Sequence, residues 1–207
     1  MFTLQCFTGG IAQTNGWLLS VNDVHILVDA PEGVAEWLDP MGLKIGALVL
    51  THQHFDHVLG ASEIVEKYGC PVLAWNPFSR DLTLERLYGA VTGSPFHVMA
   101  FEVSEVLEGR STASFGGMDW TLFHIPGHSP DSVCFYQPEL GLVLGGDVLF
   151  ESGVGRTDFP GGSWEMLLTG IERDLLPLPD QTRVLPGHGG ETTIGRERMM
   201  NPFLIQS

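Results

Sequence analysis

Basic side chains are scarce in this sequence of 207 residues. Lys and Arg together number 10, against 25 Asp and Glu, so the formal net charge is −15. A field of that sign repels phosphate backbones and anionic lipid surfaces. We therefore expect no nucleic-acid partner and no membrane partner, and a small molecule is the expected substrate.

Cysteine is also rare, and long apolar runs are missing. Three widely spaced cysteines, mostly in apolar stretches, favour free core thiols over disulfides or a Cys-based zinc site: Cys6, Cys70 and Cys134. No run approaches the roughly 20 apolar residues that cross a bilayer. The start of the sequence lacks the basic and apolar segments of a secretory signal. These absences predict a cytoplasmic protein.

The sequence has no internal repeat, low-complexity segment or linker, so we expect one domain over residues 1–207. Apolar, β-branched runs predict strands at Trp17–Val21, His25–Val28, Ile45–Leu50, Val72–Trp75, Met99–Val103, Trp120–Ile125, Val133–Tyr136, Gly141–Leu144 and Arg183–Leu185. Helical periodicity predicts helices at Gly33–Leu38, Ala61–Tyr68 and, after a Ser163 cap, Trp164–Leu176. Ser79–Val91 has a thinner apolar face and is interpreted as a helix or a flap. Many strands with few helices predict either an α+β arrangement or a four-layer sandwich.

The most informative segment directly follows the expected strand Ile45–Leu50. It reads Thr51-His52-Gln53-His54-Phe55-Asp56-His57. His52, His54 and Asp56 are two residues apart, so they share one face of an extended segment, and the chain must turn at His57. Imidazole and carboxylate groups together suit zinc, iron or manganese. Four such groups within six positions therefore predict a metal-binding loop.

Three further polar residues each follow an apolar strand and a glycine: His128, Asp147 and His188. Glycine allows the backbone to bend closely around a site. Loops at strand ends commonly carry functional side chains. Because one loop cannot complete the coordination of two metals, we expect these residues to supply the remaining ligands.

This His-x-His-x-Asp-His motif, followed by a His, an Asp and a final His, resembles the metallo-β-lactamase superfamily from Leu18 to His188. The resemblance implies an α+β fold of the four-layer αββα sandwich type. Segments Gly155–Gly162, Pro186–Gly195 and Asn201–Phe203 are similar to short glyoxalase II-like hydrolases, which are relatives of hydroxyacylglutathione hydrolase. Larger enzymes of that group add a C-terminal helical domain that grips glutathione, and this sequence stops without it.

The resemblance also implies a role for each ligand. The first metal would be held by His52, His54 and His128. The second metal would be held by Asp56, His57 and His188. Asp147 would bridge the two metals.

Residues around the motif have weaker signals. Asp29 closes the expected strand His25–Val28, and the resemblance suggests that it orients an imidazole ligand from behind. Arg156 and Asp158 are expected to form an ion pair that braces the loop after Asp147, and the alternative is that Arg156 faces an anionic substrate. The histidines outside the motif are expected to be structural: His25, His97 and His124.

Two divalent metals roughly 3.5–4 Å apart can share a water, lower its pKa and stabilise a developing oxyanion. The hypothesis is a glyoxalase II-type thioesterase, in which hydroxide held by the metals attacks S-lactoylglutathione or a related 2-hydroxyacyl thioester. Asp56 is the expected catalytic residue, because it can also accept a hydrogen bond from that hydroxide. Zinc is the first choice of metal, and iron(II) or manganese(II) also suits His and Asp ligands.

Other functions remain open. The main alternative is a persulfide dioxygenase with one iron, which resembles the sequence at Gly155–Phe159 and would use His52, His128 and Asp147. A lactonase of the same superfamily is a further alternative, whereas the charge of −15 argues against a nuclease. A metal-dependent sensor or scaffold would use the same residues without catalysis.

Overall fold

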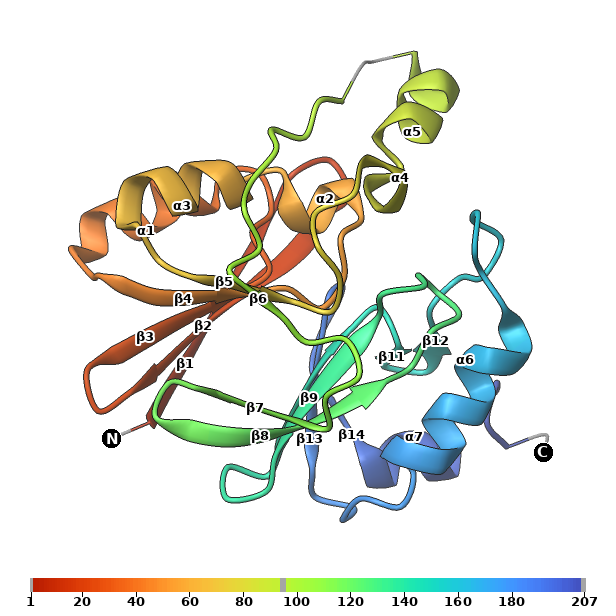
Figure 1. The fold of residues 1–207 in the computed structure, drawn as a ribbon. Coiled ribbons are helices and arrows are strands. Elements are labelled where there is room, and N and C mark those ends of the chain that lie inside the picture. The colour runs from red at the N-terminus through yellow and green to blue at the C-terminus, as the bar shows by residue number, and fades with distance from the viewer. Residues whose placement is uncertain (1, 94–95, 206–207) are drawn as a thin grey trace. The chain divides into compact units, whose positions relative to one another are not determined.

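The computed structural model describes residues 2–93 and 96–205. The chain divides into two compact units, and the first contains a six-stranded sheet in the order β1-β2-β3-β4-β5-β6 (Figure 1). This unit comprises Met1–Gly109 and Phe115–Gly117. Its strands are β1 (Phe2–Gly9), β2 (Thr14–Val21), β3 (Val24–Val28), β4 (Ile45–Val49), β5 (Val72–Ala74) and β6 (Glu105–Val106). The first three are antiparallel neighbours, whereas β3 to β6 run parallel. The carboxyl ends of β3, β4 and β5 therefore lie at one edge of the sheet.

Helices of the first unit pack on this sheet through one apolar cluster. The helices are α1 (Val34–Leu38), the 3₁₀ helix η1 (Asp39–Met41), α2 (Phe55–Val58), α3 (Ala61–Tyr68), α4 (Arg80–Thr83) and α5 (Glu85–Thr92). Leu38, Val58 and Ile64, from α1, α2 and α3, are fully buried with Leu27 and Leu48 of the strands. Alternate side chains of a strand point to one face, which places both leucines under the helices. α4 and α5 stand apart from α1 and α3 (Figure 1), and α5 contacts α2 through Tyr88 and Phe55.

The second unit, Arg110–Ser114 with Met118–Ser207, has a sheet in the order β14-β13-β10-β9-β8-β7. Its strands are β7 (Thr112–Phe115), β8 (Met118–His124), β9 (Val133–Gln137), β10 (Leu142–Gly146), β13 (Arg183–Pro186) and β14 (Thr192–Thr193), with a separate hairpin of β11 (Leu149–Phe150) and β12 (Gly153–Val154). β9 is antiparallel to both β8 and β10, and β10 is parallel to β13. The carboxyl ends of β8, β10 and β13 therefore lie at one edge.

Two helical segments pack on the second sheet. They are α6 (Trp164–Gly170), continued by the π-helical turn η2 (Ile171–Leu175), and α7 (Ile194–Met200). Leu167, Ile171 and Ile194 are fully buried in one cluster with Val143 and Val184 of the strands. The predicted cap is confirmed, because the Ser163 hydroxyl accepts a hydrogen bond from the Met166 amide at 3.3 Å.

Several sequence predictions need correction. All predicted strands are present except Met99–Val103, which is irregular. Its Phe101 is buried in the first apolar cluster, so packing rather than strand pairing explains its apolar character. Ser79–Val91 forms two short helices instead of one.

The prediction that the chain is extended through Asp56 is also wrong. Helix α2 begins at Phe55, so Asp56 lies in a helix. Cys6 is exposed on β1, unlike the buried Cys70 and Cys134, and the three cysteines form no disulfide with one another. Among the described residues, no helix is long and apolar enough to cross a membrane.

Candidate metal-binding groups

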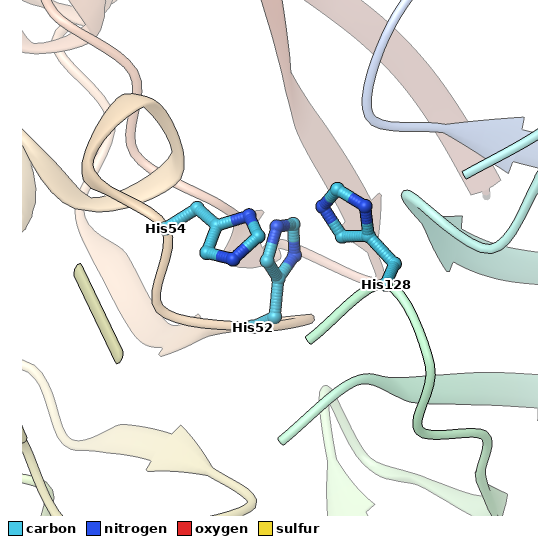
Figure 2. A group of neighbouring side chains, drawn as sticks. All are labelled: His52, His54 and His128. Carbon is cyan, nitrogen blue, oxygen red and sulfur yellow. The ribbon is translucent and has the colours of Figure 1, made fainter. Parts of the chain in front are cut away.

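The four ligand-type residues of the first unit lie at the edge where β3, β4 and β5 end. His52 and His54 come from the loop after β4, and their ring centroids are 4.6 Å apart in an edge-on arrangement (Figure 2). Asp56 and His57 come from α2. Ring nitrogens of His52 lie within 4.8 Å of ring nitrogens of both His54 and His57. All three histidines are at least 95% buried. Removing such a cluster of polar groups from water costs free energy.

Asp29 is the centre of the hydrogen bonds behind these rings. It follows β3 with a left-handed φ of 58°, and its carboxylate is 1% exposed. The carboxylate accepts the Thr51 amide and the Thr51 hydroxyl, both at 2.8 Å, and lies 2.8 Å from Nδ1 of His57. Because a carboxylate oxygen accepts, the proton of His57 lies on Nδ1 and Nε2 presents a lone pair.

The same reasoning extends to His52. The Thr51 hydroxyl uses its proton for Asp29, so it accepts from Nδ1 of His52 at 3.1 Å. His52 therefore also presents Nε2 as a lone-pair donor. Asp29 thus sets the tautomer of two imidazoles, one directly and one through Thr51.

Asp56 is fixed by a residue from a different strand. The hydroxyl of Thr14, at the start of β2, donates to Oδ2 of Asp56 at 2.7 Å. The same carboxylate oxygen lies 3.5 Å from Nε2 of His57. Thr14 is fully buried, whereas the Asp56 side chain is 13% exposed.

The second unit brings its three predicted ligands together at its own sheet edge. β10 and β13 pair at Gly146 and Pro186, and the Gly187 amide donates to the Gly146 carbonyl at 2.9 Å. Asp147 and His188 directly follow these positions, and Nε2 of His188 lies 3.3 Å from Oδ2 of Asp147.

His128 lies on the loop after β8 (Figure 2). Its Nδ1 is 2.9 Å from the carbonyl oxygen of Arg156, which only accepts, so this ring also presents Nε2. That nitrogen lies 3.4 Å from Oδ2 of Asp147. In both units, therefore, Nε2 of a buried imidazole lies within 3.5 Å of a carboxylate oxygen: His57 beside Asp56, and His128 beside Asp147.

These contacts test whether a metal fits. For His57 and His128 a lone pair on Nε2 faces a carboxylate oxygen at 3.5 Å and 3.4 Å. Two such acceptors repel each other unless a cation or a proton lies near both. Imidazole and carboxylate ligands suit zinc, iron and manganese, so the donor sets of both units fit divalent metals.

The residues predicted to lie outside the site make other contacts. His25 hydrogen-bonds the Ser20 hydroxyl at 2.7 Å, and Nε2 of His124 hydrogen-bonds the Pro130 carbonyl at 2.9 Å. The predicted ion pair of Arg156 with Asp158 is present, with two hydrogen bonds of 2.7 Å and 2.6 Å. Sequence reasoning missed Thr14, because β2 begins there, three residues before the strand predicted from Trp17.

The chain matches known relatives along most of its length. The family model for the metallo-beta-lactamase superfamily matches residues 9–188. The "Probable metallo-hydrolase YqgX" of Bacillus subtilis is 38% identical over 199 residues, which cover 94% of each chain. The "Hydroxyacylglutathione hydrolase GloC" of Haemophilus influenzae is 34% identical over 206 residues, which cover 93% of each.

Solved structures agree with these matches. The "BLEG-1 B3 metallo-beta-lactamase" is 32% identical, with a TM-score of 0.87 over 98% of this chain and 99% of that one. "TTHA1623 in a di-iron-bound form" is 36% identical, with a TM-score of 0.82 over 97% of this chain and 100% of that one. The predicted metallo-β-lactamase fold, with mixed sheets and covering helices, is confirmed. The chain belongs to the metallo-β-lactamase superfamily.

Proposed function

We propose that this protein is a dinuclear metal-dependent hydrolase that cleaves hydroxyacyl thioesters such as S-lactoylglutathione. The observation that carries the proposal is the fixed tautomer of His52, His57 and His128, each of which presents Nε2 while its Nδ1 hydrogen-bonds the protein. Orientation of this kind is typical of metal-ligating histidine. Similarity over 93% of its length to a relative named hydroxyacylglutathione hydrolase supports the thioester substrate.

The two ligand sets are proposed to serve one dinuclear centre. The support is the family model, which spans residues 9–188 and so includes both units. The first metal would be held by His52, His54 and His128. The second would be held by Asp56, His57 and His188, with Asp147 shared between them.

When bound, two divalent metals supply an acidified water and electrostatic stabilisation of the oxyanion that develops at the carbonyl. The protein residues orient the reactants. The Thr14 hydroxyl occupies one lone pair of Asp56 Oδ2, which leaves the carboxylate able to accept a hydrogen bond from the attacking water. The pKa of a thiol is lower than that of an alcohol, so the thiolate leaves without being protonated. No general acid is therefore required.

Zinc is the proposed metal at both positions. The donor sets contain imidazole and carboxylate only, which iron(II) and manganese(II) also accept. The similar protein TTHA1623 was solved with two irons, so iron is the first alternative.

The test measures metal content per chain and hydrolysis of S-lactoylglutathione on protein purified without chelator. We expect two metals per chain and rapid hydrolysis of the thioester, with slow turnover of a β-lactam. One iron, with oxygen consumption on glutathione persulfide and little hydrolysis, would favour the dioxygenase instead. Faster hydrolysis of a β-lactam than of the thioester would instead assign a β-lactamase activity, which the name of the similar protein BLEG-1 states.

A ligand variant sharpens this test. His57→Ala removes the imidazole that Asp29 orients, so we expect loss of one metal and a fall in hydrolysis of more than about 100-fold. His97→Ala, an exposed histidine outside the motif, is the matched control and should keep both metals and the full rate. A His57→Ala protein with two metals and full activity would disprove the dinuclear mechanism.

A further inference from the structure

Gln53 lies between the ligand histidines His52 and His54, and its side chain is completely buried. Its amide nitrogen donates to the carbonyl oxygens of Asn76 and Pro77, both at 3.1 Å. Its amide oxygen accepts the backbone amide of Ser79 at 3.0 Å. One side chain of the metal-binding loop thus holds three backbone groups of a single segment, residues 76–79.

That segment leads directly into α4 and α5. Ser79 caps α4, because its hydroxyl accepts the Asp81 amide at 3.3 Å. We call residues 79–93 the arm, which stands apart from α1 and α3 in Figure 1. Gln53 therefore fixes the residue at which the arm begins.

A second contact joins the loop to the arm independently of Gln53. Phe55, which follows His54 and is 1% exposed, lies 4.5 Å between ring centroids from Tyr88 of α5 and 4.6 Å from Phe96. Aromatic pairs at this separation add stabilisation beyond their buried area. The loop is thus linked to both helices of the arm.

Hydrogen bonds also join α4 and α5 to each other and to Val98. Arg80 donates to the buried carboxylate of Glu85 at 2.7 Å and to the Val98 carbonyl at 3.2 Å, and the Val98 amide donates to Glu85 at 2.6 Å. Leu84, between α4 and α5, has a left-handed φ of 55°, which is strained for a leucine. The Arg80–Glu85 ion pair, in which the Glu85 side chain is 6% exposed and the Arg80 side chain 39% exposed, therefore joins α4 to α5 across the strained residue Leu84.

We propose that Gln53 is a positioning residue that couples the metal-binding loop to the arm, so that metal at His52 and His54 orders the arm and an ordered arm strengthens metal binding. This inference rests on the proposed function of both histidines as ligands. Such coupling is reciprocal: whatever factor the metal contributes to the order of the arm, the arm returns to the metal affinity.

The experiment measures trypsin cleavage at Arg86, an exposed residue of α5, in full-length protein stripped with chelator and then titrated with zinc chloride. In the wild type we expect zinc to slow cleavage at this bond by at least about fivefold. Gln53→Met keeps the side-chain volume and removes the three hydrogen bonds. We expect this variant to lose most of the zinc-dependent protection and to bind zinc more weakly by a similar factor.

The chain offers a matched control. Gln137 of the second unit is also buried and also bonds three backbone groups, those of Asp119, Glu139 and Leu140. Gln137→Met should therefore lose stability as Gln53→Met does but keep the zinc-dependent protection at Arg86. Tyr88→Leu, at a half-buried site, removes the aromatic contact and should also reduce the protection, which gives a second variant if Gln53→Met does not fold.

Zinc content measured on the same samples separates the two ideas. Wild-type protein that binds neither zinc nor iron(II) would overturn both the proposed function and this inference. Zinc bound normally, with equal protection at Arg86 in wild type, Gln53→Met and Tyr88→Leu, would overturn the coupling and leave the proposed function intact.

Discussion

In the first unit, four ligand-type side chains come from six consecutive residues, whereas in the second unit three come from the ends of three strands. Both units set the proton of an imidazole on Nδ1, but the acceptors differ. The first unit uses the buried carboxylate of Asp29, which bonds Thr51 and His57. The second uses a backbone carbonyl, that of Arg156, to hold His128.

The second unit also has a close backbone approach at Gly155. In the second unit, a Cβ added at Gly155 would lie 2.0 Å from the carbonyl oxygen of Asp147 and 3.0 Å from Cβ of His128. Only glycine permits that approach between the two ligand loops of this unit. The first unit therefore depends on the buried carboxylate of Asp29, whereas the second depends on a backbone carbonyl and on the absence of a side chain at Gly155.

The largest effect should come from Asp29→Asn, which tests the first half of this comparison. Asn tolerates the left-handed φ of 58°, so the change isolates the carboxylate. An amide cannot accept from the Thr51 amide, the Thr51 hydroxyl and His57 together, so the tautomer of His57 is no longer fixed. We expect metal affinity to fall by about 10–100-fold, measured by competition with a coloured chelator.

Asp23→Asn is the control for this variant, since Asp23 also has a left-handed φ, of 65°, but lies exposed in a turn. It should leave the metal affinity unchanged. If the two variants behaved alike, the carboxylate of Asp29 would not be what orients the first unit's ligands.

Gly155→Ala tests the second half and should have the next largest effect. The added methyl group must displace the Asp147 or His128 backbone, and overpacking of this kind typically costs about 1–3 kcal/mol of unfolding free energy. Gly153→Ala, two residues away, meets its nearest atom at 3.6 Å and should change the unfolding free energy by less than about 0.5 kcal/mol. Urea unfolding of both variants measures the difference. Equal stabilities would mean that the loop moves freely and that the close approach is not required.

The same contrast explains what could be predicted from the sequence. The four ligand-type residues of the first unit are neighbours in the sequence, so their types and spacing were enough to predict that their side chains gather at one place. The turn was predicted at His57, but the chain enters α2 at Phe55. A spacing of two residues between His52, His54 and Asp56 fits both an extended segment and a segment that enters a helix. Thr14 could not be identified, since its contact with Asp56 depends on how β2 lies beside the loop.

In the second unit, strand ends and glycines indicated His128, Asp147 and His188, but their contacts depend on sheet order. Nothing local in the sequence shows that β10 pairs in parallel with β13, which places Asp147 beside His188. Helix α7 was missed, although its cap is local: the Thr193 hydroxyl accepts a hydrogen bond from the Arg196 amide at 3.3 Å. Glu197, on α7, is buried because its carboxylate accepts the Ser152 amide and the Asn201 side chain, and these partners become visible only in the fold.

The smallest effect should come from Asp158→Asn, which asks whether side chains also support His128. The hydrogen bond from Arg156 lowers the pKa of Asp158 from 3.8 to about 2. A lowered folded-state pKa means that the contribution of the pair is present above the unfolded pKa and is lost as the pH falls from about 4 towards 2. Both side chains are more than half exposed, so solvent screens the pair.

We therefore expect Asp158→Asn to leave the melting temperature at pH 7 nearly unchanged and to remove only a small acid-dependent loss, measured by thermal unfolding from pH 2 to pH 7. Glu191→Gln, which breaks a pair with Arg183 whose side chains are 38% and 39% exposed, is the control. A loss of metal at pH 7 in Asp158→Asn alone would break the comparison. It would mean that the ion pair holds the Arg156 carbonyl against His128, so that the second unit, like the first, orients its imidazole through a carboxylate.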